Sequence, residues 1–224
     1  MADILPNAIP DVEGLRARWG AFAFTAENQA TAKTIIGRYP PGRQHSAIIP
    51  LLDMAQRQVG AETETQGWLP VPVIEYVAKY LDMPYIRAYE VATFYTMFNL
   101  RPVGRYHLQV CGTTPCMLRG SDDVFDACYA KGMKKGGTTE DGLFTLSEVE
   151  CLGACANAPM VQINDDNYED LTFDSMTAII EAFQRGDTPR SGPQIDRQTS
   201  APEGGPTTLV KMTERNYDYR GQWK

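Results

Sequence analysis

The sequence predicts an α+β protein in which a small helical bundle precedes an α/β domain and an extended tail ends the chain. Apolar residues recur at helical spacing through the first hundred residues, alternate as in strands through the middle, and lose any period toward the end. All five cysteines lie in the middle part. We therefore expect a bundle over residues 1–102, an α/β domain over 103–186 and a tail over 187–224.

The bundle is predicted from four helical segments in order. A weak helix covers about residues 26–37. The next has one apolar face, formed by Ile48, Leu51, Leu52, Ala55 and Val59. A further stripe covers residues 73–81, after two prolines that suit a first helical turn. In residues 84–98, aromatic and apolar side chains occupy nearly every face, so we expect this helix to be bundle core rather than a partner-facing surface.

The period changes at Arg105. Strands are expected where apolar and polar residues alternate, at 106–110, 144–149, 161–163 and 168–171. A helix lies between the first two, with the apolar stripe Val124, Phe125, Cys128 and Tyr129. The last helix follows Thr172, a suitable N-cap, and stops at Gly186. This order is a βαβ unit followed by a ββα unit, which predicts a thioredoxin-like fold.

Composition and charge exclude several classes of function. The net charge is −7 and the sequence pI about 4.9, a balance that repels nucleic-acid phosphates. No apolar run is long enough for a membrane span, so we expect no direct membrane insertion. Residues Met1–Pro6 lack the basic and apolar regions of a secretory signal. We therefore expect a reducing cytoplasm, where cysteines are more often metal ligands or reactive thiols than disulfides.

Four of the five cysteines form two pairs. Cys111 and Cys116 enclose four residues, and Cys151 and Cys155 enclose three. Each pair follows a predicted strand, so neighbouring strands would bring both loops to one end of the sheet. Four thiolates there can hold a [2Fe–2S] cluster or a tetrahedral zinc ion. The loops are wider than the C-x2-C knuckles of structural zinc sites, which favours the two-iron cluster.

The other candidate residues have simpler interpretations. Cys128 lies on an apolar stripe and is expected to be a buried small hydrophobe. His45 and His107 lack a neighbouring acid or thiol and are expected to be structural or surface residues. The sequence contains neither the C-x-x-C of dithiol exchange nor a G-x-G-x-x-G or P-loop motif for a nucleotide. We expect no catalytic residue on this chain, and we predict a cis peptide bond at Ala158-Pro159.

Several motifs resemble the 24 kDa [2Fe–2S] subunits of respiratory complex I. In the α/β part, the motifs that carry the resemblance are Cys111–Gly120 (CGTTPCMLRG), Asp141–Leu146 (DGLFTL) and Glu150–Pro159 (ECLGACANAP). The helical part agrees through Gly67–Pro70 (GWLP) and Tyr89–Phe98 (YEVATFYTMF). The resemblance runs from about residue 24 to 185, and its motifs are highly specific.

The resemblance implies one [2Fe–2S] cluster, with Cys111, Cys116, Cys151 and Cys155 at the four ligand positions. It also implies docking beside a flavoprotein subunit that holds FMN and oxidises NADH, and beside the large iron–sulfur subunit. The chain would then be a non-nucleotide-binding, electron-transfer subunit of a proton-translocating NADH:quinone oxidoreductase, cytoplasmic and peripheral to the inner membrane. The alternatives are the equivalent subunit of an NAD-linked hydrogenase or formate dehydrogenase, or a zinc-stapled interaction module.

The negative charge is concentrated around the cysteines. Residues 106–186 hold five Lys and Arg against thirteen Asp and Glu, a net −8. An added electron makes an anionic cluster more negative, so nearby carboxylates lower its reduction potential. We hypothesise that Glu148 and Glu150 act in this way; the alternative is that the acids only keep the surface soluble.

Overall fold

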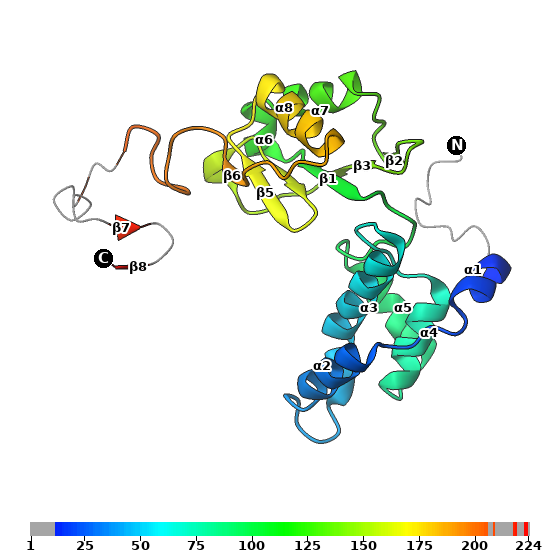
Figure 1. Ribbon diagram of the computed structural model, residues 1–224. Helices are drawn as coiled ribbons and strands as arrows, with labels where there is room; N and C mark the ends of the chain where they lie inside the picture. Colours follow the sequence, from blue (N-terminus) through cyan, green and yellow to red (C-terminus); the bar gives the residue numbers. More distant parts are fainter. Residues whose placement is uncertain (1–11, 206–207, 209–216, 219–221, 224) are drawn as a thin grey trace. The chain divides into compact units, whose positions relative to one another are not determined.

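Two compact units make up the chain, with the division between Arg105 and Tyr106 (Figure 1). The computed structural model describes residues 12–205, 208, 217–218 and 222–223. The expectations for Met1–Pro6 and for most of the tail beyond residue 205 lie outside these residues. Among the described helices, none combines the length and the hydropathy that a membrane span requires.

The first unit is the predicted helical bundle. Its helices are α1 (Val12–Trp19), α2 (Ala26–Ile36), α3 (Ile48–Thr63), α4 (Val71–Tyr80) and α5 (Tyr85–Phe94), with a 3-10 turn η1 (Gln44–Ala47) before α3. The Thr25 side chain caps α2 by accepting from the Asn28 N–H at 3.2 Å. The apolar stripes of α3 and α4 are buried together, as the sequence predicts.

The expectation for α5 is wrong in two respects. The helix ends at Phe94 instead of continuing to Phe98, because Tyr95 adopts an extended backbone. Its buried face is made by Ala88 and Ala92, which are one helical turn apart and small enough for close packing. Tyr89, Val91 and Phe98 pack in or against the bundle core, as expected, whereas five large apolar side chains of the segment are exposed: Tyr85, Ile86, Phe94, Tyr95 and Met97.

The second unit is built on one six-stranded sheet. Its strands are β1 (Tyr106–Cys111), β2 (Gly137–Thr138), β3 (Phe144–Val149), β4 (Val161–Ile163), β5 (Asp166–Glu169) and β6 (Gly192–Pro193), in the spatial order β2-β3-β1-β4-β5-β6. Strand β1 pairs in parallel with β3 and antiparallel with β4, and β4 forms a hairpin with β5. The predicted βαβ and ββα units are confirmed.

Strands β2 and β6 have no signal in the sequence, because two residues are too few to show an alternating pattern. A further two-residue pair, β7 (Tyr217–Asp218) and β8 (Gln222–Trp223), lies in the tail.

Three helices complete this unit: α6 (Thr114–Leu118), α7 (Ser121–Ala130) and α8 (Phe173–Gln184). Helices α7 and α8 lie side by side over the sheet (Figure 1) and bury their apolar faces against it. Thr172 begins α8 with a capping box to Ser175, as expected for an N-cap. Cys128 is fully buried in this core, and the Ala158-Pro159 peptide bond is cis; both predictions are confirmed.

His107 is a buried residue of β1. Its Nε2 lies 2.9 Å from the Ser147 hydroxyl on β3, and its backbone N–H donates to the Asn164 side chain at 2.9 Å. Burial lowers the pKa of His107 to about 4, because the charged imidazolium loses its hydration. The prediction of a structural role for this residue agrees with these contacts.

We predict that His107 stays neutral well below pH 6.5. Since its folded-state pKa lies below the unfolded value, its contribution to folding is complete above pH 6.5 and is lost as the pH falls toward 4. The loss between pH 7.5 and pH 5 is about 2 kcal/mol relative to a His107→Gln variant. An NMR titration checks this directly, because the chain has only two histidines and a His45→Gln variant assigns the signals. A His107 midpoint near 6.5 would contradict the prediction.

Candidate metal centre

The register of the sheet brings the two cysteine loops to one end of it. Cys111 is the last residue of β1 and lies opposite Val149, the last residue of the parallel strand β3. Cys116 follows in the short helix α6, while Cys151 follows just beyond β3. Cys155 begins the 3-10 turn η2 (Cys155–Asn157).

The four sulfur atoms are arranged as two pairs. Cys151 Sγ lies 3.4 Å from Cys155 Sγ, and the thiols of Cys111 and Cys116 hydrogen-bond to each other. The two loops are in contact, since Leu152 and Ala154 of the second loop pack against the buried Cys111 and Cys116. Cys111 and Cys116 are buried, whereas Cys151 and Cys155 are exposed. The structure thus brings the four predicted residues to one end of the sheet as two pairs of free thiols.

Backbone N–H groups point at the buried sulfurs. Cys111 accepts hydrogen bonds from the N–H groups of Thr113 and Leu152, and Cys116 accepts one from Met160. Burial alone would raise the pKa of Cys111, but these hydrogen bonds, together with those from the side chains of Cys116 and Thr113, outweigh it and the net shift is downward. Leu152 belongs to the second loop, so its N–H ties the two loops together. The glycines Gly112 and Gly153 indicate that N–H groups can approach the sulfurs, but the sequence does not identify these three donors, because the direction of a main-chain N–H cannot be read from residue type.

Burial has the largest effect on the thiols of Cys116 and Cys128. It raises the pKa of Cys116 to about 12, assisted by the neighbouring Cys111, and it raises the pKa of Cys128 to about 12 as well. Cys128 lies in the α7–α8 core and takes no part in the cluster of sulfurs. A buried thiol with a raised pKa is unreactive, which agrees with its prediction as a small hydrophobe.

Two carboxylates flank the first loop. A Cβ on Gly112 would lie 2.3 Å from Glu148 Oε1, so the Glu148 carboxylate rests against the backbone that follows Cys111. Glu148 also forms an ion pair with Lys135, which sequence analysis did not connect with the site. Glu150 Oε2 accepts from the Thr113 hydroxyl at 3.5 Å. Both residues of the hypothesis about reduction potential therefore lie beside the cysteine loops.

The edge of the site is apolar. Met117 and Leu118 follow Cys116 in α6 and are exposed, Leu118 by 76%. Because the second cysteine pair is exposed too, the sulfurs open onto a surface that a partner protein can cover.

The donor set fits a two-iron cluster. The sulfurs form two pairs, and a [2Fe–2S] cluster takes two thiolates at each iron. Among the residues that the structure describes, no three His, Cys, Asp or Glu side chains are close enough together to hold one metal ion. The N–H groups that donate to the sulfurs also suit a [2Fe–2S] cluster, since hydrogen bonds to thiolates help to set the cluster's reduction potential.

Comparisons with known proteins agree with this geometry. Residues 32–184 match the family described as thioredoxin-like [2Fe-2S] ferredoxin. The E subunit of the NADH-quinone oxidoreductase of Rickettsia conorii is 65% identical over 164 residues, which are 73% of this chain and 95% of that protein. The corresponding protein of Rickettsia bellii is 62% identical over 164 residues, with the same shares covered.

A solved structure, an NAD+-reducing [NiFe]-hydrogenase in the air-oxidized state, has a similar fold. Its TM-score is 0.51 at 20% identity, and the match covers 62% of this chain and 23% of the hydrogenase chain. At that identity the likeness speaks for the fold alone, and it agrees with the predicted α+β, thioredoxin-like architecture. The family match takes in both cysteine pairs and most of the helical unit, and the chain belongs to the thioredoxin-like [2Fe–2S] ferredoxins.

Proposed function

We propose that this chain is the electron-transfer subunit of an NADH:quinone oxidoreductase and carries one [2Fe–2S] cluster on Cys111, Cys116, Cys151 and Cys155. The observation that carries the proposal is the meeting of two thiol pairs at one end of the sheet, with N–H donors on the buried sulfurs. The identity of 65% to the Rickettsia conorii oxidoreductase subunit, over 95% of that relative, supports the assignment to this class of complex.

The bound cluster supplies one-electron oxidation and reduction. The chain's own residues do the rest. Cys111 and Cys116 hold the cluster against the protein interior, and Cys151 and Cys155 hold it at the surface. The N–H groups of Thr113, Leu152 and Met160 stabilise negative charge on the sulfurs, and this charge increases on reduction.

The partner we propose is a flavoprotein subunit that holds FMN and oxidises NADH, with the large iron–sulfur subunit as a second neighbour. The sequence has no nucleotide-binding motif of its own. The exposed Met117 and Leu118 give the cysteine edge an apolar rim that suits a protein contact. In this assignment the complex is proton-translocating, and the chain lies in its cytoplasmic arm, peripheral to the inner membrane.

The second candidate is the equivalent subunit of an NAD-linked hydrogenase. An NAD+-reducing hydrogenase shares the fold, but the identity there is 20% against 65% for the Rickettsia conorii oxidoreductase subunit, so the oxidoreductase is the better supported proposal. Deleting the gene for this chain distinguishes the two candidate functions. If the main proposal holds, the deletion abolishes NADH-dependent quinone reduction. If the alternative holds, it abolishes NAD-dependent hydrogen oxidation.

We predict that the full chain, purified anaerobically, is red-brown, contains iron and labile sulfide in equal amounts, and gives a rhombic EPR signal on reduction. A Cys151→Ser variant should lose or strongly change this spectrum, because it removes one of four thiolates. Cys128→Ser is the matched control and should leave it intact, since Cys128 lies in the helical core. A colourless protein with one zinc ion would refute the cluster, and a bleached Cys128→Ser protein would refute the ligand set.

We further predict that NADH reduces this chain's cluster only when the flavoprotein subunit is present. The physical reason is that the sequence has no G-x-G-x-x-G or P-loop motif for a nucleotide, so we assign the dinucleotide to the partner. Visible absorbance after NADH addition, with and without the partner, measures this. Rapid reduction of the isolated chain by NADH would contradict the division of roles.

Neutralising Glu148 and Glu150 should raise the cluster's reduction potential by roughly tens of millivolts, with a smaller effect at high salt. Each substitution removes a negative charge beside the cysteine loops. Glu140→Gln is the control, because residue 140 precedes β3 at the end away from the cysteines. Equal potentials in the double variant and the wild type would leave the acids with a solubility role only.

A further inference from the structure

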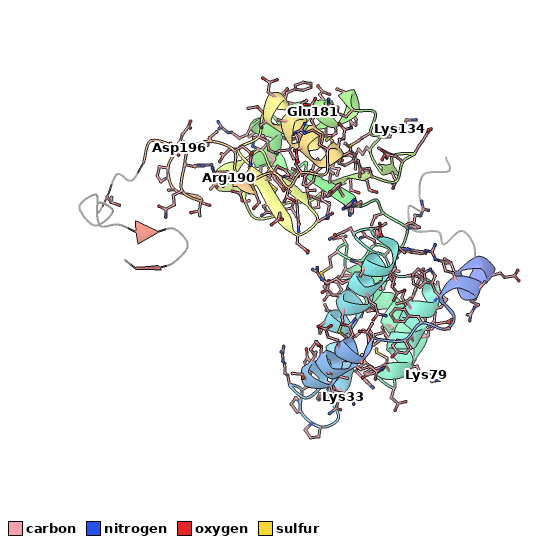
Figure 2. All side chains as sticks on the ribbon, viewed as in Figure 1. Lys33, Lys79, Lys134, Glu181, Arg190 and Asp196 are labelled. Carbon is pink, nitrogen blue, oxygen red and sulfur yellow. The ribbon has the colours of Figure 1, made fainter. Side chains whose placement is uncertain are left out.

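The chain returns to the second cysteine loop after it leaves α8. Strand β6 pairs in parallel with β5, with Gly192 opposite Tyr168, and the Gln194 N–H donates to the Glu169 carbonyl at 2.9 Å. Figure 2 labels Arg190 and Asp196 on this segment. The family match ends at residue 184, so residues 192–201 lie outside the part of the chain that defines the family. We call residues 192–201 the strap.

Arg197 is the strap's main contact. Its Nε donates to Asp170 Oδ2 at 2.8 Å and its Nη2 to Asp170 Oδ1, a two-point ion pair. The side chains of Arg197 and Asp170 are only 9% and 7% exposed. Nη2 also donates to the carbonyl of Ala156 at 2.9 Å, and Ala156 is the residue that follows Cys155. The guanidinium therefore holds the main chain directly beside the last sulfur ligand.

Asn157 provides the second point of attachment. It is completely buried, and its Nδ2 donates to the strap carbonyl of Thr199 at 2.9 Å. The main-chain carbonyl of Asn157 accepts a hydrogen bond from the Asp170 N–H at 2.8 Å. The strap thus fixes the turn η2, which begins at Cys155, through Arg197 and Thr199. Asp170 contacts both the strap, at Arg197, and the turn, at Asn157.

On its outer side, the loop has little support apart from the strap. Cys151 and Cys155 are exposed, and the short turn η2 is only three residues long. Removing Arg197 would leave the Asp170 carboxylate buried without its partner and would free the Ala156 carbonyl. Broken buried ion pairs are strongly destabilising, and here the effect falls next to Cys155.

We propose that the strap holds the Cys151–Cys155 loop in its cluster-binding shape, with Arg197 as the positioning residue. The proposal rests on the cluster proposed above. Arg197 acts through the Ala156 carbonyl and through Asp170, rather than through a sulfur atom. A strap that merely fastens the tail would affect the stability of the whole unit and would have no selective effect on the loop.

The test compares Arg197→Gln with Arg185→Gln in the full chain. Arg185 forms an ion pair with Asp187 at 3.0 Å in which both side chains are 61% exposed, so its loss should have little effect. The first readout is the rate at which an iron chelator bleaches the cluster under anaerobic conditions. The second is hydrogen exchange of residues 151–158, with β1 as the internal reference.

We expect Arg197→Gln to lose its cluster at least about tenfold faster than the wild type, the equivalent of one lost hydrogen bond to a charged group. Exchange in residues 151–158 should accelerate while exchange in β1 is unchanged. In both readouts, Arg197→Lys should give a rate between those of the wild type and Arg197→Gln, because an ammonium keeps the charge without the two-point geometry. Arg185→Gln should match the wild type in both readouts.

Wild-type rates in Arg197→Gln, or equal acceleration in β1 and the loop, would overturn the proposal. If the wild type itself contains neither iron nor sulfide, the cluster proposal fails, and hydrogen exchange still decides whether the strap holds the loop. Should Arg197→Gln not fold, Asp170→Asn combined with Arg197→Gln removes the unpaired charge, and the same comparison applies.

Discussion

Cys111 lies opposite Val149 in the parallel pairing of β1 with β3, and this register decides where the thiols meet. Parallel strands end at the same edge of a sheet, so the loops that follow them are neighbours although thirty-four residues separate the pairs in sequence. A shift of one residue would turn the side chain of Cys111 to the other face. The alternating core residues of both strands, among them Leu108 and Leu146, prevent that shift because they are fully buried.

The electrostatics of the site follow from its position at the strand ends. Backbone N–H groups from Thr113, Leu152 and Met160 converge on the buried sulfurs, whereas carboxylates gather on the solvent side. The two groups act in opposite directions on an anionic centre, since the dipoles stabilise added negative charge and the carboxylates oppose it. Lys135 pairs with Glu148 and offsets part of the carboxylate effect.

Sequence reasoning predicted the parts of this structure that depend on local pattern. The alternation in β1 and β3, the Thr172 cap and the burial of Cys128 all have such a pattern. The long-range contacts do not: Arg197 is one cation in a polar segment, and its burial depends on Asp170, twenty-seven residues earlier. The prediction for helix α5 is wrong for a related reason. A segment that is apolar on every face does not indicate which face packs against the bundle.

The two sides of the second loop explain how an exposed pair of thiols keeps a defined shape. On the inner side the Leu152 N–H is bonded to Cys111, and on the outer side the Ala156 carbonyl is bonded to Arg197. Between these anchors, Gly153 adopts a positive φ of 84°, which a residue with a side chain would adopt only with strain. Electron transfer favours groups that are already in place, because dipoles held by the protein need no reorganisation when the charge changes. A loop held from both sides meets that requirement at the surface, where a partner must approach.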